Sequence, residues 1–226
     1  MRCRTVLVTL LVVPTVAFSQ ATPRAEIDHL IIAINNIDQG IRDFTALTGV
    51  TPEKGGQHPG RNTQNALVSL GSGRYLEILA PAASVSNPET VIPFPKLTLG
   101  GWALRGSLDA QLAGLKAAGF AIVGPTPGSR QKPDGGMLEW RTGGAQGPGL
   151  SLAPFLIEWS ARTPHPSSTS PGGCTLDNVI VREADPTNLQ KFFTAVGYRG
   201  KASRGERGMV INLTCPKGKV SFATIE

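Results

Sequence analysis

The sequence contains few aromatic, histidine and cysteine residues. Of its 226 residues, 6% are Phe, Trp or Tyr, 3 are His and 3 are Cys. The basic residues Lys201, Arg204 and Arg207 cluster among glycines, with no aromatic side chains interleaved as base-stacking platforms. A formal net charge of +6 on the full chain is also a mild excess. We therefore expect no nucleic-acid binding, and we interpret the basic cluster as a solvated loop.

The sequence also lacks an apolar run long enough for a comfortable membrane span, which needs about 20 residues. Its longest N-terminal run, Val6 to Phe18, follows two arginines, is interrupted by Pro14 and ends in a small-residue cleavage pattern. This arrangement is typical of a secretory signal peptide, which we place at residues 1–19; the alternative is an uncleaved anchor. We expect an exported protein, periplasmic or secreted, with no stable membrane span after cleavage.

Cysteine is scarce enough for its pairing to be considered directly. Cys3 would leave with the signal peptide, so Cys174 and Cys215 remain as a pair in an exported protein. An oxidising compartment permits a disulfide between them. The alternative, a reactive thiol or metal ligand, lacks the CxxC spacing of such sites.

Three helix-like segments, each ending in a glycine, recur along the chain. They end at Gly49, Gly119 and Gly197, and apolar residues recur at helical spacing within each. A strand-like run precedes each segment, and residues 27–34 (IDHLIIAI) match residues 176–183 (LDNVIVRE) position by position. Further strand-like runs follow at residues 65–70, 74–80, 137–142, 150–159, 209–214 and 219–225. The pattern predicts an α+β fold of repeated βαβββ units.

Such a unit leaves one sheet face uncovered, so we expect the copies to form open curved sheets around a cavity. Residues 26–160 are predicted to form a paired βαβββ domain, residues 161–173 a linker, and residues 174–226 a third βαβββ-like unit packed on the first two. In the third unit, a parallel pairing of the first and last strands would bring the two cysteines close together. A third unit without an obvious partner also suggests a homodimer.

Several stretches together resemble a known family. These are EIDHLIIAI, LTGVTPEKGGQHPGRNTQNALVSLGSGRYLEILAP, GGWALRG and PFLIEW. They resemble the glyoxalase-like members of the vicinal oxygen chelate superfamily. The resemblance implies paired βαβββ units around a cavity, with a divalent metal held by a His or Gln on strand 1 and a Glu on strand 4 of each unit.

Carried over residue by residue, the resemblance implies His29 and Glu77 as metal ligands in the first unit. Strand alternation agrees, because it directs both side chains to one side of the sheet. The second unit departs from the pattern: Gly100 or Trp102 stands at the strand-1 position, and Glu158 remains as a strand-4 acid. The expected metal set is therefore His29, Glu77 and Glu158, with Glu77 also able to shuttle a proton as the catalytic residue.

Three further residues are candidates for binding a substrate. His58 could donate a hydrogen bond from the rim, although its Gly/Pro setting also suits a plain turn residue. Asn65 could do so from a strand entrance, where Asn is also a common turn residue. Trp102 could form an apolar wall of the cavity or be a core residue. His165, in the linker, is a weaker candidate.

Two main functions follow from these residues. One is a metal-dependent lyase or isomerase acting on a small carbonyl-containing molecule, whose oxygens the ion would polarise. The other is a metal-free protein that binds a small molecule without changing it. A structural, partner-binding module is a third interpretation, and it requires Glu77 to face solvent or to find a partner.

Overall fold

The computed structural model describes residues 24–58 and 60–224. The predicted signal peptide, residues 1–19, lies outside the described residues. Among the described residues, no helix is both long and apolar enough to cross a membrane.

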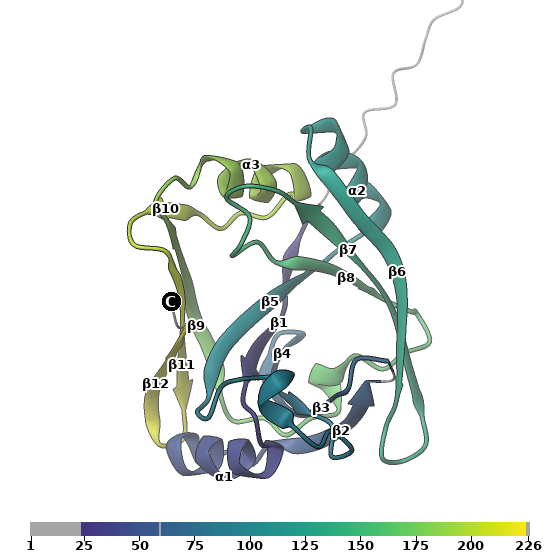
Figure 1. Ribbon diagram of the computed structural model, residues 1–226, viewed down its shortest axis with the longest axis vertical. Coiled ribbons are helices and arrows are strands. Elements are labelled where there is room, and N and C mark those ends of the chain that lie inside the picture. Colours follow the sequence, from purple (N-terminus) through teal and green to yellow (C-terminus); the bar gives the residue numbers. More distant parts are fainter. Residues whose placement is uncertain (1–23, 59, 225–226) are drawn as a thin grey trace, which may run out of the picture.

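The chain folds as three successive groups of strands, each with one helix (Figure 1). The first contains β1 (Glu26–Ala33), α1 (Ile37–Thr48), β2 (Glu53–His58), β3 (Thr63–Gly71) and β4 (Arg74–Pro81). The second contains β5 (Thr98–Arg105), α2 (Leu108–Ala117), β6 (Ala121–Gln131), β7 (Met137–Gln146) and β8 (Phe155–Trp159). The third contains β9 (Thr175–Glu183), α3 (Thr187–Val196), β10 (Ala202–Arg204), β11 (Gly208–Cys215) and β12 (Gly218–Ala223). Two 3₁₀ turns, Pro88–Thr90 and Pro166–Ser168, lie between the groups.

The first two groups join into one sheet of eight strands in the order β2-β3-β4-β1-β5-β8-β7-β6. Within each group the first strand pairs in parallel with the last, β1 with β4 and β5 with β8. The two groups meet through the antiparallel pair β1–β5. This curved sheet confirms the predicted α+β class with repeated βαβββ units around a cavity (Figure 1).

The two edge strands of this sheet, β2 and β6, approach each other. The guanidinium of Arg130 in β6 donates to the carbonyl of Gly55 in β2. Gly56 adopts a positive φ of 127°, and a Cβ there would lie 2.4 Å from the carbonyl oxygen of Gln131. Side chains at this point would therefore keep the edges apart, and the glycines permit the sheet to curve almost into a barrel.

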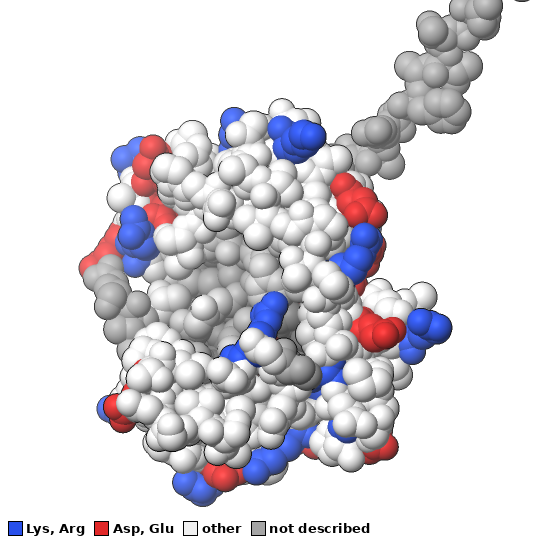
Figure 2. All heavy atoms as spheres, turned by 45° about the vertical axis from the view of Figure 1, so that its right-hand side comes forward, with Lys and Arg blue, Asp and Glu red and all other residues white. Residues whose placement is uncertain are grey.

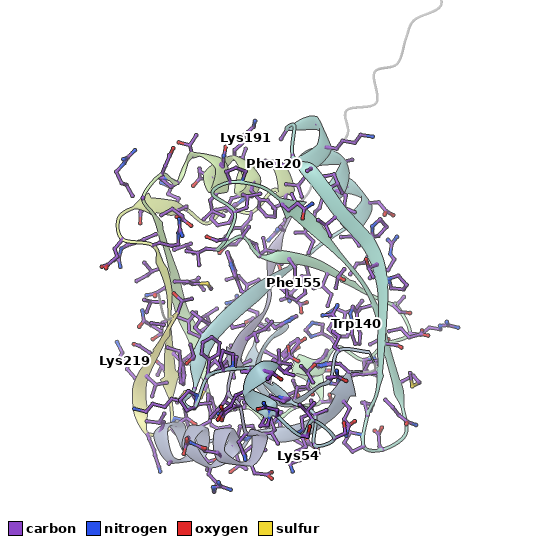
Figure 3. All side chains as sticks on the ribbon, in the orientation of Figure 1. Lys54, Phe120, Trp140, Phe155, Lys191 and Lys219 are labelled. Atoms are coloured by element: carbon purple, nitrogen blue, oxygen red, sulfur yellow. A yellow bond between two sulfur atoms is a disulfide. The ribbon has the colours of Figure 1, made fainter. Side chains whose placement is uncertain are left out.

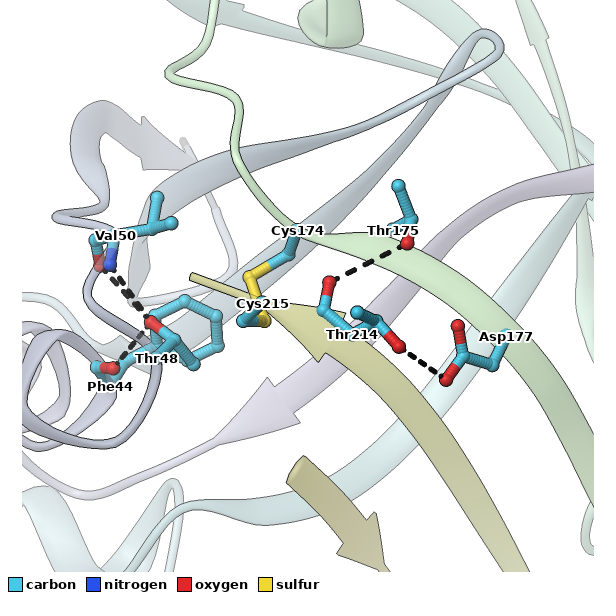
Figure 4. Close-up of a disulfide and its surroundings, with 8 residues drawn as sticks. All are labelled: Phe44, Thr48, Val50, Cys174, Thr175, Asp177, Thr214 and Cys215. Atoms are coloured by element: carbon cyan, nitrogen blue, oxygen red, sulfur yellow. Dashed lines mark hydrogen bonds between the residues drawn. A yellow bond between two sulfur atoms is a disulfide. The ribbon is translucent and has the colours of Figure 1, made fainter. Parts of the chain in front are cut away.

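The third group forms its own four-stranded sheet, in the order β10-β9-β11-β12. Its first strand, β9, pairs in parallel with β10 and antiparallel with β11, so it does not lie beside the last strand as expected. Cys174 and Cys215 nevertheless form a disulfide, because the register of β9 with β11 pairs Thr175 with Thr214 and leaves the cysteines opposite each other (Figure 4). The prediction of proximity was right, but the strand pairing behind it was wrong.

The hydrophobic core lies between the outer face of the eight-stranded sheet, the helices and the C-terminal sheet. Phe44 of α1 stacks on Phe222 of β12, with ring centroids 6.0 Å apart. Phe193 of α3 packs edge-on against Trp102 of β5 at 5.7 Å. Helices α2 and α3 lie side by side at one end of the molecule (Figure 1). The packing leaves the inner, concave face of the large sheet available for a site.

Candidate functional site

The concave face of the eight-stranded sheet encloses a cavity of about 270 Å³. We call it the inner cavity. Strands from both βαβββ units line it, and Trp140 and Phe155 form part of its wall from β7 and β8 (Figure 3). Its lining consists of His29, Ile31, His58, Arg61, Thr63, Asn65, Tyr75, Glu77, Leu79, Arg130, Trp140, Thr142, Phe155, Ile157 and Trp159. Figure 2 shows a hollowed face with basic side chains at the edge of the hollow and no acidic side chain exposed within it.

Glu77 is the acidic residue of the inner cavity. Strand alternation in β4 turns Tyr75, Glu77 and Leu79 to the concave face. The carboxylate is buried, 7% exposed, and accepts a hydrogen bond of 2.6 Å from the amide nitrogen of Asn65. Its oxygens lie 3.8 Å from Nε2 of His29 and 3.6 Å from Nε2 of His58. The structure thus brings together four residues singled out in the sequence.

Asp28 holds His29 in place from the other side. The register of β1 against β5 shifts between Ile27 and His29, so Asp28 is the extra residue of a β-bulge. The bulge directs its carboxylate inward, fully buried, to bond Nδ1 of His29 at 2.7 Å and Nε2 of His165 at 3.0 Å. The indole N–H of Trp159 donates to the same carboxylate at 3.2 Å.

Burial alone would raise the pKa of Asp28, but hydrogen bonds from His165 and His29 hold it well below its usual range. The carboxylate is therefore ionised and can only accept, so the proton on His29 resides on Nδ1 when the ring is neutral. That leaves Nε2 of His29 facing Glu77 with its lone pair toward the cavity.

His58 lies at the end of β2, with Nδ1 3.0 Å from the hydroxyl of Thr63. Its Nε2 lies 3.3 Å from the amide nitrogen of Asn65. Burial lowers the pKa of His58, against the attraction of the Glu77 carboxylate, which raises it. The positive charges of Arg130 and Arg61 lower it further. His58 is therefore a neutral group at pH 7 that can donate a hydrogen bond to a bound molecule or accept one from it.

Arg130 supplies a positive charge inside the cavity. The side chain is 3% exposed, and burial lowers its pKa while the nearby carboxylate of Glu77 raises it. The side-chain amide oxygen Oδ1 of Asn65 is buried close by with no hydrogen-bond partner within the described part of the chain. An unsatisfied buried acceptor costs free energy, so it is a natural contact for a donor on a bound molecule.

Glu158 does not join this group. In the β7–β8 pair, Arg141 lies opposite Glu158, whereas Thr142 lies opposite Ile157, and it is Thr142 and Ile157 that line the cavity. Glu158 faces away and forms an ion pair with Arg141 beside a more open hollow of about 660 Å³. The expectation that Glu158 would complete a metal set with His29 and Glu77 was therefore wrong. Side chains alternate along β8, so Ile157 faces the cavity and the next residue, Glu158, faces away from it.

Trp102 is also absent from the cavity lining. Its partner across the β1–β5 pair is Leu30, a core residue, and paired residues point to the same face. Trp102 is 2% exposed, donates to the carbonyl of Leu152 and packs against α3. It is a core residue, the alternative that the sequence left open, and the predicted substrate contact is not made.

The donor set does not fit the four-ligand metal site that the resemblance implies. The second unit presents Ala103, Phe155 and Ile157 where further ligands would be needed. No group of three or more His, Cys, Asp or Glu side chains in residues 24–58 and 60–224 is arranged to hold a metal ion. His29, His58 and Glu77 of the first unit face the cavity but are not arranged as a ligand set. The described lining from the second unit adds no His, Cys, Asp or Glu, so the expected four-ligand site is not formed.

Sequence reasoning missed Asp28, Tyr75 and Arg130. Asp28 could have been noticed as an acid beside a candidate histidine in an otherwise apolar strand, but alternation would have pointed it the other way. Tyr75 shares the strand face of Glu77, and its ring stacks on His29 with centroids 4.6 Å apart. Arg130 lies in a Gly/Pro-rich stretch that carried no strand signal.

Comparisons with known proteins agree with this architecture. Residues 27–197 match the family model described as a glyoxalase-like domain. A solved structure of a hypothetical protein from Staphylococcus aureus is similar in fold, with a TM-score of 0.61 and 16% identity over 88% of this chain and 85% of that chain. No curated protein matches the sequence.

Two methylmalonyl-CoA epimerase structures are also similar. The enzyme from Mycobacterium tuberculosis gives a TM-score of 0.43 at 19% identity, over 63% of this chain and 92% of that chain. A methylmalonyl-CoA epimerase in complex with methylmalonyl-CoA and NH4+ gives 0.45 at 18% identity, over 63% and 99%.

Proposed function

This chain belongs to the glyoxalase-like domain family, and on that premise we propose that it is an isomerase or lyase that moves a proton on a small carbonyl compound held in the inner cavity. The single observation that supports this most is the buried Glu77 carboxylate, which faces the cavity between His29 and His58. A carboxylate in such a pocket is a competent general base when a substrate excludes water from it.

In the proposed reaction, Glu77 takes the proton from the carbon next to the substrate carbonyl. The electron pair of that C–H bond moves to the carbonyl oxygen, which becomes an enolate. The enolate then either regains a proton on carbon, giving an isomer, or expels a substituent from the neighbouring carbon, giving a lyase product. The proton taken by Glu77 returns to carbon or leaves with that substituent.

The other residues of the cavity would stabilise these steps. The buried guanidinium of Arg130 supplies a fixed positive charge that stabilises the enolate oxygen. A metal ion performs this task in metal-dependent enzymes. Asp28 and Tyr75 fix the ring of His29 so that Nε2 faces the reacting atoms. Asn65 keeps the Glu77 carboxylate directed at the cavity through its 2.6 Å hydrogen bond.

Proton exchange tests the proposal directly. Dihydroxyacetone, acetoin and 2-oxobutanoate would each be incubated with the protein in D₂O, and loss of the proton next to the carbonyl followed by NMR. We expect exchange of at least one compound to be accelerated, and Glu77→Gln to slow it by about 100-fold or more. Glu158→Gln, which removes a carboxylate outside the cavity, serves as the matched control and should exchange normally. Equal rates for wild type and Glu77→Gln would refute the proposal.

Metal content separates this proposal from the metal-dependent form. Because the donor set is incomplete, we expect elemental analysis to find no stoichiometric divalent ion and chelation to leave exchange unchanged. A divalent ion present at one per chain in the wild type and absent from His29→Ala would restore the metal-dependent interpretation.

A metal-free binding protein is the second candidate. The apolar side chains of Trp140, Phe155 and Ile157 on the second-unit side of the cavity favour it, because they provide apolar contact area but no acidic, basic or charged group. It predicts that a small carbonyl compound binds, measured by calorimetry, while its protons exchange no faster than in buffer.

We also propose that the protein acts outside the cytoplasm, and that two copies could associate. The Cys174–Cys215 disulfide supports export, because such bonds persist in oxidising compartments. Fractionation of the source cells tests the location, and light scattering of the mature chain tests the homodimer.

A further inference from the structure

The inner cavity continues into a second space of about 380 Å³, which we call the outer trough. Arg61, Thr142 and Phe155 line both spaces, so the two are contiguous. Beyond these shared residues, the outer trough follows β7 and the segment before β8. It is lined there by Val123, Thr126, Gly143, Gly144, Ala145, Leu150, Ala153 and Pro154.

The outer trough is open partly because glycine, which has no side chain, lines it. Gly144 alternates with Trp140 and Thr142 on the concave face of β7, so a side chain there would enter the trough. A Cβ on Gly144 would come no closer than 4.0 Å to the nearest neighbour, the Cα of Phe155. Gly144 is therefore not required by close packing, and its effect is to keep the space open.

The two spaces differ in chemistry. Arg61 is the sole charged side chain among the described residues of the outer trough, and the remainder of the lining is apolar, glycine or threonine. Among the residues that the structure describes, the inner cavity contains Arg61, Arg130, His29 and His58 around a single acid, Glu77. One space therefore suits a polar, anionic group, and the other suits an apolar chain.

Resting on the proposed function, we infer that the substrate class is linear 2-oxo acids with an apolar chain. The carboxylate and carbonyl oxygens lie against Arg61 and Arg130, since guanidinium groups bind such paired oxygens well. The carbon next to the carbonyl then faces Glu77, and the chain leaves the inner cavity past Phe155 into the outer trough. Pyruvate would fill only the inner cavity.

A chain-length series tests this assignment by calorimetry with wild-type protein. Pyruvate, 2-oxobutanoate, 2-oxohexanoate and 2-oxooctanoate should bind with affinity rising about four-fold for each methylene that enters the trough. The ketone 2-octanone, which lacks the carboxylate, should bind far more weakly than 2-oxooctanoate. Arg61→Gln should weaken binding of every acid in the series and leave 2-octanone unchanged.

Gly144 provides the test of the trough itself. Gly144→Leu should abolish the gain with chain length while 2-oxobutanoate still binds, and Gly144→Ala, whose methyl group has room, should lose part of that gain. Gly172→Leu is the matched control, because a Cβ on Gly172 has no neighbour within 4 Å and Gly172 lines neither space. It should keep the full chain-length dependence.

The possible failures are distinguishable. If 2-oxobutanoate binds but longer chains gain nothing, or if Gly144→Leu keeps the gain, the outer trough is not the chain site, while proton exchange through Glu77 stands. If no 2-oxo acid binds although dihydroxyacetone or acetoin is exchanged, the substrate class is wrong and the proposed function survives. If nothing is exchanged or bound, both are overturned.

Discussion

At the scale of single residues, Asp28 is the residue of the site whose burial depends most on its hydrogen-bond partners. A fully buried carboxylate is costly unless it is paired, and Asp28 receives hydrogen bonds from two imidazoles and one indole. We expect Asp28→Asn to lower the free energy of unfolding by about 3 to 5 kcal/mol, because an amide nitrogen would then face those donors. Urea unfolding measures the loss, and Asp109→Asn, at an exposed carboxylate, is the control.

The pH dependence of stability should show the same interaction. The pKa of Asp28 lies below its unfolded value of about 4, so its stabilisation is fully present above that pH and is lost as pH falls toward the folded pKa. Wild-type protein should therefore lose stability in acid more steeply than Asp28→Asn. Parallel acid profiles for the two proteins would contradict this assignment.

His58 gives a prediction that does not depend on stability. Burial lowers its pKa, and the Glu77 carboxylate is the group that most opposes the decrease. Glu77→Gln should therefore lower the pKa of His58 further, which an NMR titration of the imidazole would detect. Glu158→Gln should leave the titration unchanged, and an unchanged pKa of His58 after Glu77→Gln would show that the two groups do not interact.

At the scale of strands, much of the site followed from alternation. Alternation from His29 in β1 and Glu77 in β4 predicted that both would face one side of the sheet, and both line the cavity. It failed where the strands are irregular. A bulge turns Asp28 inward, and a register shift near Gly100 places Trp102 on the core face. Neither irregularity has a local sequence signal strong enough to locate it in advance.

Strands rich in glycine were the hardest to predict. Residues 53–58 and 121–131 form β2 and β6, yet neither was among the strand-like runs identified in the sequence, because Gly and Pro lower strand propensity. Contact between the two edges explains the outcome, because Arg130 of β6 reaches the backbone of β2 at Gly55. The glycines that weaken strand propensity are what allow that approach.

Adding one methyl group to this contact tests how tight it is. A Cβ on Gly55 would lie 2.4 Å from the side-chain amide oxygen Oδ1 of Asn65 and 3.1 Å from the Arg130 guanidinium. We expect Gly55→Ala to destabilise the fold by about 1 to 3 kcal/mol in urea unfolding. Gly101→Ala, in the open region of β5, should leave stability unchanged or raise it by less than about 1 kcal/mol. Equal effects at the two positions would mean that the edge contact is loose.

At the scale of the whole molecule, the resemblance seen in the sequence to glyoxalase-like proteins is confirmed by the family match. What the repeat could not reveal was the different strand order of the third group, whose short β10 takes a place beside β9. That order depends on long-range packing against α1 and β5, which no local pattern records.

The disulfide should contribute to the stability of the entire chain. It joins Cys174 to Cys215, 41 residues apart, and so restricts the unfolded chain. The loop-entropy relation predicts that replacing both cysteines by serine lowers the free energy of unfolding by about 4 kcal/mol. Urea unfolding of the oxidised, reduced and double-serine proteins measures it, and the last two should agree. A double-serine protein as stable as the oxidised one would show that the unfolded chain gains no freedom.

The position of Asp28 between two imidazoles has a practical consequence. All three histidines of the chain, His29, His58 and His165, belong to this one site. A reagent that acylates imidazoles, such as diethyl pyrocarbonate, is therefore a site-specific label for this protein. The exposed side-chain fractions of 24%, 13% and 3% give the order of modification as His165, His58, His29. Protection by a bound compound would report occupancy of the site with no assay for turnover.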